Sequence, residues 1–256
     1  MDSSNFRISN SMLRDWEELC PIQWKARYMD GTLEWNESQA MRWGTYFETL
    51  AIGSGVMGKT VTLTSTEEKS VNNERAKKQA KRCRGYLKHR GRKLHVQRYL
   101  NAEITDSAGQ VIPIMGGLDI EYFFAEEGRE GIIDLKFTGD VENDYGKFQW
   151  GNTDKIDVSQ LLHYGLIKQF ITGEWPILEY WVFDNSAEMK QIMLRVNVEE
   201  SSIQAHIERV SKAYNEIIMS MDFLGFAPKN SFKNCNACKV KCEHERKIPE
   251  IVEIYK

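Results

Sequence analysis

The stretch that decides the fold is residues 116–139, GGLDIEYFFAEEGREGIIDLKFTG. Two apolar runs flank the segment AEEGRE, which is typical of two strands joined by a tight turn. If the turn is centred between Glu126 and Glu127, antiparallel pairing places Asp119 opposite Asp134. The period of two then puts Asp134 and Lys136 on one face of the sheet, and the other face receives Ile133, Leu135 and Phe137.

Two directly opposed carboxylates repel each other unless a cation or a shared proton relieves them, because their Cβ atoms are only about 5 Å apart. Oxygen ligands from two Asp side chains and water suit Mg²⁺ or Mn²⁺. Lys136 beside them would orient a water molecule or stabilise negative charge on a phosphate. The alternative is a solvent-exposed strand face without a functional role, since Asp and Lys are common surface residues.

The elements around this hairpin predict an α+β or α/β protein with helices packed on a central sheet. Helical spacing of apolar residues indicates helices over 10–29, 37–52, 67–90, 156–173 and 199–222, with Pro21 interrupting the first. Strand patterns fill 94–137 as a meander, and LEYWVFD with MKQIMLRVNV forms a late strand pair. On the third helix, one face carries apolar residues including Cys83, which predicts a core thiol.

The 256-residue chain has 34 Lys and Arg against 37 Asp and Glu, which excludes a uniformly basic nucleic-acid-binding protein. Residues 75–93 nevertheless hold ten basic residues and no acid. Such a run is either a solvated helix face or a contact for phosphates. No stretch approaches the roughly 20 apolar residues of a membrane span and no signal peptide is recognisable, so we expect a cytoplasmic protein. Five cysteines in a reducing compartment favour metal ligation or free thiols.

The pattern Gly-x-x-Asp, followed after a hairpin by Asp-Leu-Lys, resembles the PD-(D/E)XK nuclease superfamily. Upstream, RWGTYFETLAIG resembles the first-motif helix and places Glu48 where relatives carry Glu or, in many RecB-like members, His. Downstream, SQLLHYGLI has Gln160 and Tyr164 at i and i+4, like the Gln-x-x-x-Tyr motif of RecB-like nucleases.

The two ends of the chain resemble the iron-sulfur branch of that family, which includes AddB-type and CRISPR-adaptation nucleases. SNSMLRDWEELCPIQW carries Cys20, and NCNACKVKC carries Cys235, Cys238 and Cys242. One Cys before the nuclease core and three after it resembles the arrangement that holds a [4Fe-4S] cluster in those relatives. Four thiolates equally suit tetrahedral Zn²⁺, and the chemistry alone does not choose between them.

A competing motif spans Gly53 to Thr60, where GSGVMGKT fits the P-loop pattern GxxxxGK[ST]. A P-loop works when a strand leads into the glycines and a helix follows, so that helix N-terminal amides hold the phosphates. Here a helical segment precedes, and the β-branched VTLTS run that follows is poor for a helix. The context therefore disfavours an ATPase.

We expect a metal-dependent DNA nuclease, most simply an exonuclease acting in DNA processing, repair or phage and mobile-element recombination. The resemblance implies a restriction-endonuclease-like core, in which helices flank a central mixed sheet. The alternatives are a non-catalytic DNA-binding module that keeps the fold, and the P-loop ATPase. Residues 1–256 would form one nuclease domain, in which 1–30 and 225–256 make the cysteine clasp and 67–93 a basic helical insertion. The resemblance implies that Mg²⁺ or Mn²⁺ binds Asp119, Asp134, Glu48 and the Leu135 carbonyl, that Lys136 positions the attacking water, and that Gln160 and Tyr164 contact a phosphate or fix the ligands. DNA backbone phosphates would follow the basic face made of Lys77, Lys81, Arg84 and Lys88.

Overall fold

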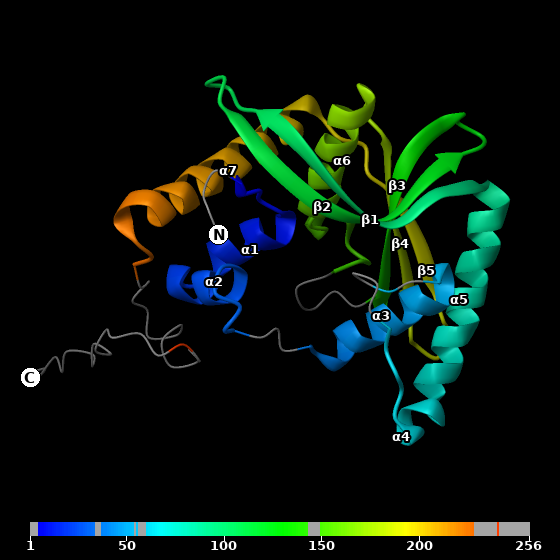
Figure 1. The fold of residues 1–256 in the computed structure, drawn as a ribbon. Coiled ribbons are helices and arrows are strands. Elements are labelled where there is room, and N and C mark those ends of the chain that lie inside the picture. The colour runs from blue at the N-terminus through cyan, green and yellow to red at the C-terminus, as the bar shows by residue number, and fades with distance from the viewer. Residues whose placement is uncertain are drawn as a thin grey trace, which may run out of the picture. The chain divides into compact units, whose positions relative to one another are not determined.

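The computed structural model describes residues 5–33, 37–53, 55, 60–142, 149–227 and 240 (Figure 1). The chain forms two compact units, one of residues 37–208 and one of residues 1–36 with 209–256. The main elements of the larger unit are α3 (Gln39–Ile52), α4 (Ser65–Glu68), α5 (Val71–Arg90), β1 (Gly91–Thr105), β2 (Val111–Phe124), β3 (Arg129–Thr138), η3 (Thr153–Lys155), α6 (Ser159–Thr172), β4 (Ile177–Asp184) and β5 (Gln191–Arg195).

The larger unit is built on a five-stranded sheet with the order β1-β2-β3-β4-β5. All neighbouring strands are antiparallel except β3 and β4, which are parallel, so the sheet is mixed as expected. A parallel connection needs a crossover, and α6 supplies it between β3 and β4. The predicted meander, the helix that follows it and the late strand pair are therefore confirmed, whereas the crossover itself was not predicted.

Helices cover both faces of this sheet. On one face, α3 and α5 pack over apolar strand residues that include Ile133 and Leu135 of β3. Lys136, the next residue along β3, instead reaches Gln160 of α6. Because side chains alternate along a strand, α6 lies on the face opposite to α3 and α5.

The apolar and basic faces of α5 are arranged as its sequence predicts. Ala76, Ala80, Cys83 and Leu87 are buried, and burial raises the pKa of the Cys83 thiol to about 12. The exposed face carries Lys77, Lys81, Arg84 and Lys88. Ser70 caps the helix by accepting a hydrogen bond from the Asn73 amide.

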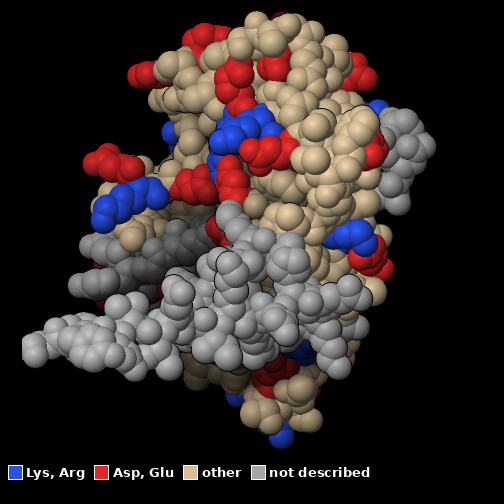
Figure 2. All heavy atoms as spheres, turned by 90° about the vertical axis from the view of Figure 1, so that its left-hand side faces the viewer, with Lys and Arg blue, Asp and Glu red and all other residues tan. Residues whose placement is uncertain are grey.

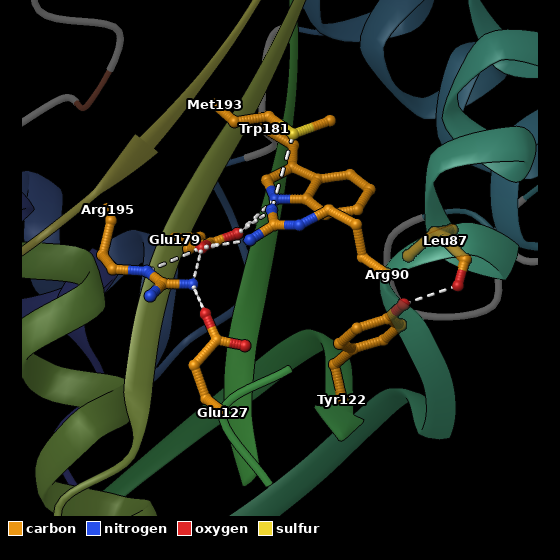
Figure 3. A network of polar contacts seen from close by, with 8 residues as sticks. All are labelled: Leu87, Arg90, Tyr122, Glu127, Glu179, Trp181, Met193 and Arg195. Atoms are coloured by element: carbon orange, nitrogen blue, oxygen red, sulfur yellow. Dashed lines mark hydrogen bonds and ion pairs between the residues drawn. The ribbon is translucent and has the colours of Figure 1, made fainter. Parts of the chain in front are cut away.

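A buried glutamate ties α5 to the sheet on the α5 face (Figure 3). Glu179 of β4 is 2% exposed, and its carboxylate accepts hydrogen bonds from Nη1 (2.8 Å) and Nη2 (3.1 Å) of Arg90. Arg195 of β5 donates to it through Nε (2.9 Å) and Nη2 (2.7 Å), and also reaches Glu127 in the β2–β3 turn. The indole of Trp181 donates a further hydrogen bond of 2.7 Å. One carboxylate thus joins α5, β4 and β5, and through Arg195 the turn that sets the β2–β3 register.

The smaller unit contains α1 (Asn10–Glu18), α2 (Pro21–Tyr28) and the C-terminal part of α7 (Glu200–Met219), which leads into the π-helical η4 (Ser220–Leu224). Its core is aromatic: Trp24 contacts the rings of Phe6, Trp16, Tyr28 and Phe226. Cys20 is buried at the N-cap of α2, directly before Pro21. Cys235, Cys238 and Cys242 lie outside the described residues. Within the described part of the chain, no helix has the length and apolar character needed to span a bilayer.

Replacing Glu179 by Ala should lower the free energy of unfolding by about 3 kcal/mol, because two guanidinium groups would lose their common carboxylate. Urea denaturation measures this change. Glu188→Ala is the matched control, since it removes a carboxylate that is 72% exposed and paired with Lys190. That variant should change stability by less than about 1 kcal/mol. Equal effects of the two substitutions would contradict the structural role of Glu179.

Candidate active site

The carboxylates predicted from the hairpin do come together. Pairing of β2 with β3 runs from Phe124↔Arg129 to Ile120↔Ile133, which is the predicted register. Asp119 and Asp134 follow at the end of this ladder and are 8% and 0% exposed. The Asp119 Oδ2 atom accepts a 2.9 Å hydrogen bond from the Leu135 amide. The two side chains are therefore held beside each other away from bulk water.

Lys136 and the helix α6 form the second wall of this group. Lys136 Nζ makes an ion pair with Asp134 Oδ2 and donates to Gln160 Oε1 at 3.3 Å. Gln160 in turn donates from Nε2 to the Tyr164 hydroxyl at 2.8 Å, one helical turn away. The predicted pair on α6 thus continues the polar chain that starts at Asp134.

A glycine lets α6 approach the sheet here. A Cβ atom at Gly116 of β2 would lie 2.8 Å from Ile167 Cδ1 and 3.0 Å from Tyr164 Cε1. These distances are shorter than ordinary carbon contacts, so a larger residue at this position would force the side chains of Ile167 and Tyr164 to shift. The glycine three residues before Asp119 therefore has a packing reason.

Glu48 reaches the same group from α3 and is 7% exposed. The residue that links it to the sheet is Gln97 of β1, whose Nε2 contacts Glu48 Oε2 at 3.4 Å and Asp119 Oδ1 at 3.3 Å. Gln97 has a φ of 48°, a left-handed conformation that is uncommon for a residue with a side chain and that is found at functional sites. Gln97 is not among the site residues predicted from the sequence. No local sequence pattern marks this residue; the β1–β2 register of the structure places position 97 opposite Asp119, between the pairs Val96↔Ile120 and Arg98↔Leu118.

The electrostatics of the site are dominated by buried negative charge. Burial, and next the charge of Asp134, raises the pKa of Asp119 from 3.8 to about 7. Burial also raises the pKa of Asp134, although the charge of Lys136 opposes that shift. Burial would lower the pKa of Lys136, but the charges of Asp134 and Asp119 raise it above its usual value. The site thus holds more carboxylate than its one ammonium group neutralises.

The donor set fits a hard divalent cation at the two aspartates. Asp134 is fully buried, and among the described residues its carboxylate is contacted by Lys136 Nζ at Oδ2, whereas Oδ1 has no hydrogen-bond partner there. In the same part of the chain, no three Asp, Glu, His or Cys side chains converge into a preassembled metal group. The Gln97 amide contacts both Glu48 and Asp119, and the Lys136 amine pairs with Asp134. The Gln97 amide therefore competes with a cation for Glu48 Oε2 and Asp119 Oδ1.

The remaining predicted site residues lie elsewhere. Lys77, Lys81, Arg84 and Lys88 lie on α5, which covers the sheet face opposite to the Lys136 side chain. Arg84 donates to the Leu50 carbonyl of α3, and Lys77 pairs with Glu74 at 3.7 Å. The P-loop-like segment begins at Gly53, which has a φ of 85° and caps the C-terminus of α3. Residues 54 and 56–59 of that segment are outside the described part, but a helix and not a strand leads into it.

Comparisons with known proteins support the fold. No protein-family model and no curated protein matches the chain. The crystal structure of a "putative exonuclease" from Eubacterium rectale superposes with a TM-score of 0.64 at 16% sequence identity, over 96% of each chain. A second structure, of SSO0001, gives a TM-score of 0.31 at 12% identity, over 85% of this chain and 96% of that one. The first comparison shows a shared fold, and at that identity it shows the fold alone.

The stability of the metal-free Asp119→Asn protein relative to the wild type should increase between pH 4 and pH 8. The folded wild type keeps a proton on Asp119 up to about pH 7, whereas the unfolded chain releases it near pH 4. The folded state therefore binds more protons between these values, and wild-type stability falls as the pH rises through this window. The Asn side chain cannot ionise, so the stability of the variant does not show this decrease with rising pH.

Denaturant unfolding in the presence of a chelator at pH 4, 6 and 8 measures the effect. The advantage of the Asn variant should be smallest at pH 4 and should grow up to about pH 7, with a limiting slope of about 1.4 kcal/mol per pH unit. A stability difference that is the same at all three values would contradict the raised pKa of Asp119.

Proposed function

We propose that the chain is a metal-dependent nuclease that hydrolyses phosphodiester bonds in DNA, most simply as an exonuclease of the RecB-like PD-(D/E)XK branch. The observation that carries the proposal is the buried group of Asp119, Asp134 and Lys136, which continues to Gln160 and Tyr164 of α6. The fold shared with the Eubacterium rectale protein, whose name refers to an exonuclease, supports it at the level of fold.

In this proposal the two aspartates hold a Mg²⁺ or Mn²⁺ ion, with the Leu135 carbonyl and Glu48 as further ligands. When bound, such a cation lowers the pKa of water and neutralises charge on the scissile phosphate. The amide of Leu135 keeps the Asp119 carboxylate fixed through its 2.9 Å hydrogen bond. Preorganised ligands of this kind need little rearrangement at the moment of reaction.

Lys136 is the positively charged side chain of the proposed site. Its ammonium group is held by Asp134 and by Gln160 Oε1, so its direction is fixed from two sides. A third N–H remains to hydrogen-bond an attacking water or an oxygen of the phosphate. Because the pKa of Lys136 is raised, the group stays protonated and acts as a donor at neutral pH.

Tyr164 is a second donor. Burial, followed by the charges of Asp134 and Asp119, raises its pKa well above the usual value, so the phenol stays protonated. Its oxygen accepts from Gln160 Nε2, which leaves the O–H free in direction to donate to a phosphate oxygen. The Gln-x-x-x-Tyr pair would therefore position the phosphate and not carry the proton transfer.

Asp134→Asn should reduce metal-dependent cleavage of end-labelled single- and double-stranded DNA by at least about 100-fold, because the buried oxygen pair loses its charge. Asp140→Asn is the control, since Asp140 is an exposed residue just after β3. It should cleave at the wild-type rate. Cleavage by Asp134→Asn at the wild-type rate would contradict the assignment, and DNA binding without cleavage by the wild type would favour the non-catalytic binding module.

We also propose that backbone phosphates contact the lysines of α5. On the face drawn in Figure 2, the described Lys and Arg side chains lie among Asp and Glu side chains and form no continuous basic patch. On α5, Lys81 and Lys88 make no ion pair with another described residue, whereas Arg75 and Arg82 donate to carbonyls of Asn185 and Met189. The lysines are therefore the better candidates for a sequence-independent contact.

Lys81→Gln with Lys88→Gln should weaken DNA binding equally for all sequences and lower the slope of log affinity against log salt by up to about 1 for each lost contact. The matched control is Lys69→Gln with Lys212→Gln, which changes the charge equally at exposed positions outside α5. If both double variants have the same salt slope, the α5 lysines are exposed to solvent and do not contact DNA.

We also propose that four cysteines join the two ends of the chain through a metal centre, which is the cysteine clasp. Three of these four cysteines lie outside the described residues. Purified protein should contain iron and sulfide, or one zinc ion per chain, bound by Cys20, Cys235, Cys238 and Cys242. Cys20→Ser should lower both metal content and stability, since a metal that closes so long a loop stabilises the fold. Cys83→Ser should lower stability alone, because Cys83 is a core thiol. Full metal content in Cys20→Ser would contradict the clasp.

A further inference from the structure

Tyr99 is an exposed aromatic residue next to the carboxylate group. It lies in β1, two residues beyond Gln97, and half of its surface (50%) is exposed. Two residues span about 7 Å of strand, and the Gln97 amide contacts Asp119. Burial and the charge of Asp119 both raise the pKa of Tyr99, and Tyr99 contributes to the raised pKa of Tyr164. Its phenol therefore lies within electrostatic range of the proposed catalytic residues.

The ring of Tyr99 is backed by a glycine. Tyr99 pairs with Gly117 across the β1–β2 ladder, and a Cβ atom at Gly117 would lie 3.0 Å from Cζ and 3.1 Å from Cε1 of the ring. The ring thus lies across the place where a side chain would be. An aromatic residue over a cross-strand glycine has its orientation fixed, while the half-exposed surface stays open to a ligand.

The two consecutive glycines of β2 admit two different tyrosines. Gly116 makes room for Tyr164 from α6, and Gly117 makes room for Tyr99 from β1. Tyr164 is buried at 8% exposure and is hydrogen-bonded by Gln160, whereas Tyr99 is half exposed. One tyrosine is therefore suited to contact a phosphate inside the site, and the other to contact a flat apolar group just outside it.

We infer that Tyr99 is a stacking platform for an unpaired nucleobase of the DNA strand whose phosphate enters the carboxylate group. This inference rests on the proposed nuclease function. Every base has a π-face, so stacking on an exposed aromatic ring is sequence-tolerant and requires that the base be unpaired. The site would accordingly take a single strand, or a duplex end whose terminal bases have separated.

Phe170 provides a matched comparison. It is as exposed as Tyr99 (56%), but it lies ten residues after Gln160 on α6, about 15 Å along the helix axis. A general effect of removing an exposed aromatic residue would appear at both positions. An effect of base stacking at the site would appear at Tyr99 alone.

The test uses full-length protein with Asp134→Asn, which is expected to bind DNA with strongly reduced cleavage, and short labelled single strands in the presence of Mg²⁺. Tyr99→Ala should weaken binding at least about fivefold, Tyr99→Phe and Tyr99→Trp should keep the affinity, and Phe170→Ala should not change it. An abasic nucleotide moved along the strand should reproduce the loss at one position. There the abasic site and Tyr99→Ala should not add, since both remove the same contact.

Three results would overturn the inference. They are equal affinity of Tyr99→Ala and its parent, a Tyr99→Phe variant as weak as Tyr99→Ala, and an abasic scan that Tyr99→Ala leaves unchanged. The second of these would indicate a hydrogen bond from the hydroxyl in place of stacking. Failure of the parent Asp134→Asn protein to bind any DNA would overturn the proposed function together with this inference, whereas binding that ignores Tyr99 would overturn the stacking alone.

Discussion

The burial of two aspartates at the end of the β2–β3 ladder is the constraint on which the rest of the larger unit depends. A carboxylate taken out of water is costly unless hydrogen bonds or an opposite charge replace its solvent. Asp119 accepts hydrogen bonds from the Leu135 backbone amide and the Gln97 side-chain amide, and Asp134 forms an ion pair with the Lys136 ammonium group. These donors come from β3 and β1, so the carboxylates are stable only where those two strands flank β2. The excess negative charge that remains is what a divalent cation would neutralise.

The two faces of the sheet divide the work of holding this site. On the α5 face, the apolar cluster and the Glu179 network hold α5, β4 and β5 against the other strands. None of the side chains of the proposed active site takes part in these contacts. On the α6 face, Gly116 leaves room for Ile167 and Tyr164 of the helix, and Gln160 of the same helix reaches Lys136. Rigid elements rather than loops therefore carry Asp119, Asp134, Lys136, Gln160 and Tyr164, which is the arrangement that positions catalytic groups most closely.

The sequence predicted those parts of the structure that depend on local pattern. The turn at AEEGRE determines the β2–β3 register, and side-chain alternation then determines that Asp134 and Lys136 share a face. The buried stripe of α5 followed in the same way from helical spacing. Gln97, Tyr99 and Glu179 were not predicted, because their roles depend on pairing between segments far apart in sequence. A left-handed backbone at Gln97 and a ring over Gly117 leave no periodic trace in the sequence. The resemblance to a nuclease family supplied Glu48, Gln160 and Tyr164, and the structural comparison shows a fold shared with one other protein but does not test these residues.

The central claim is that Asp119 and Asp134 together bind a divalent cation that the chain uses to hydrolyse phosphodiester bonds. The most direct measurement is anomalous diffraction from crystals of the wild-type protein grown with Mn²⁺, compared with crystals of Asp134→Asn grown in the same way. The account predicts an anomalous peak at about 2.2 Å from oxygens of both aspartates in the wild type, and its loss in the variant. A wild-type map with no peak between these two carboxylates, at Mn²⁺ concentrations that support DNA cleavage, would contradict it.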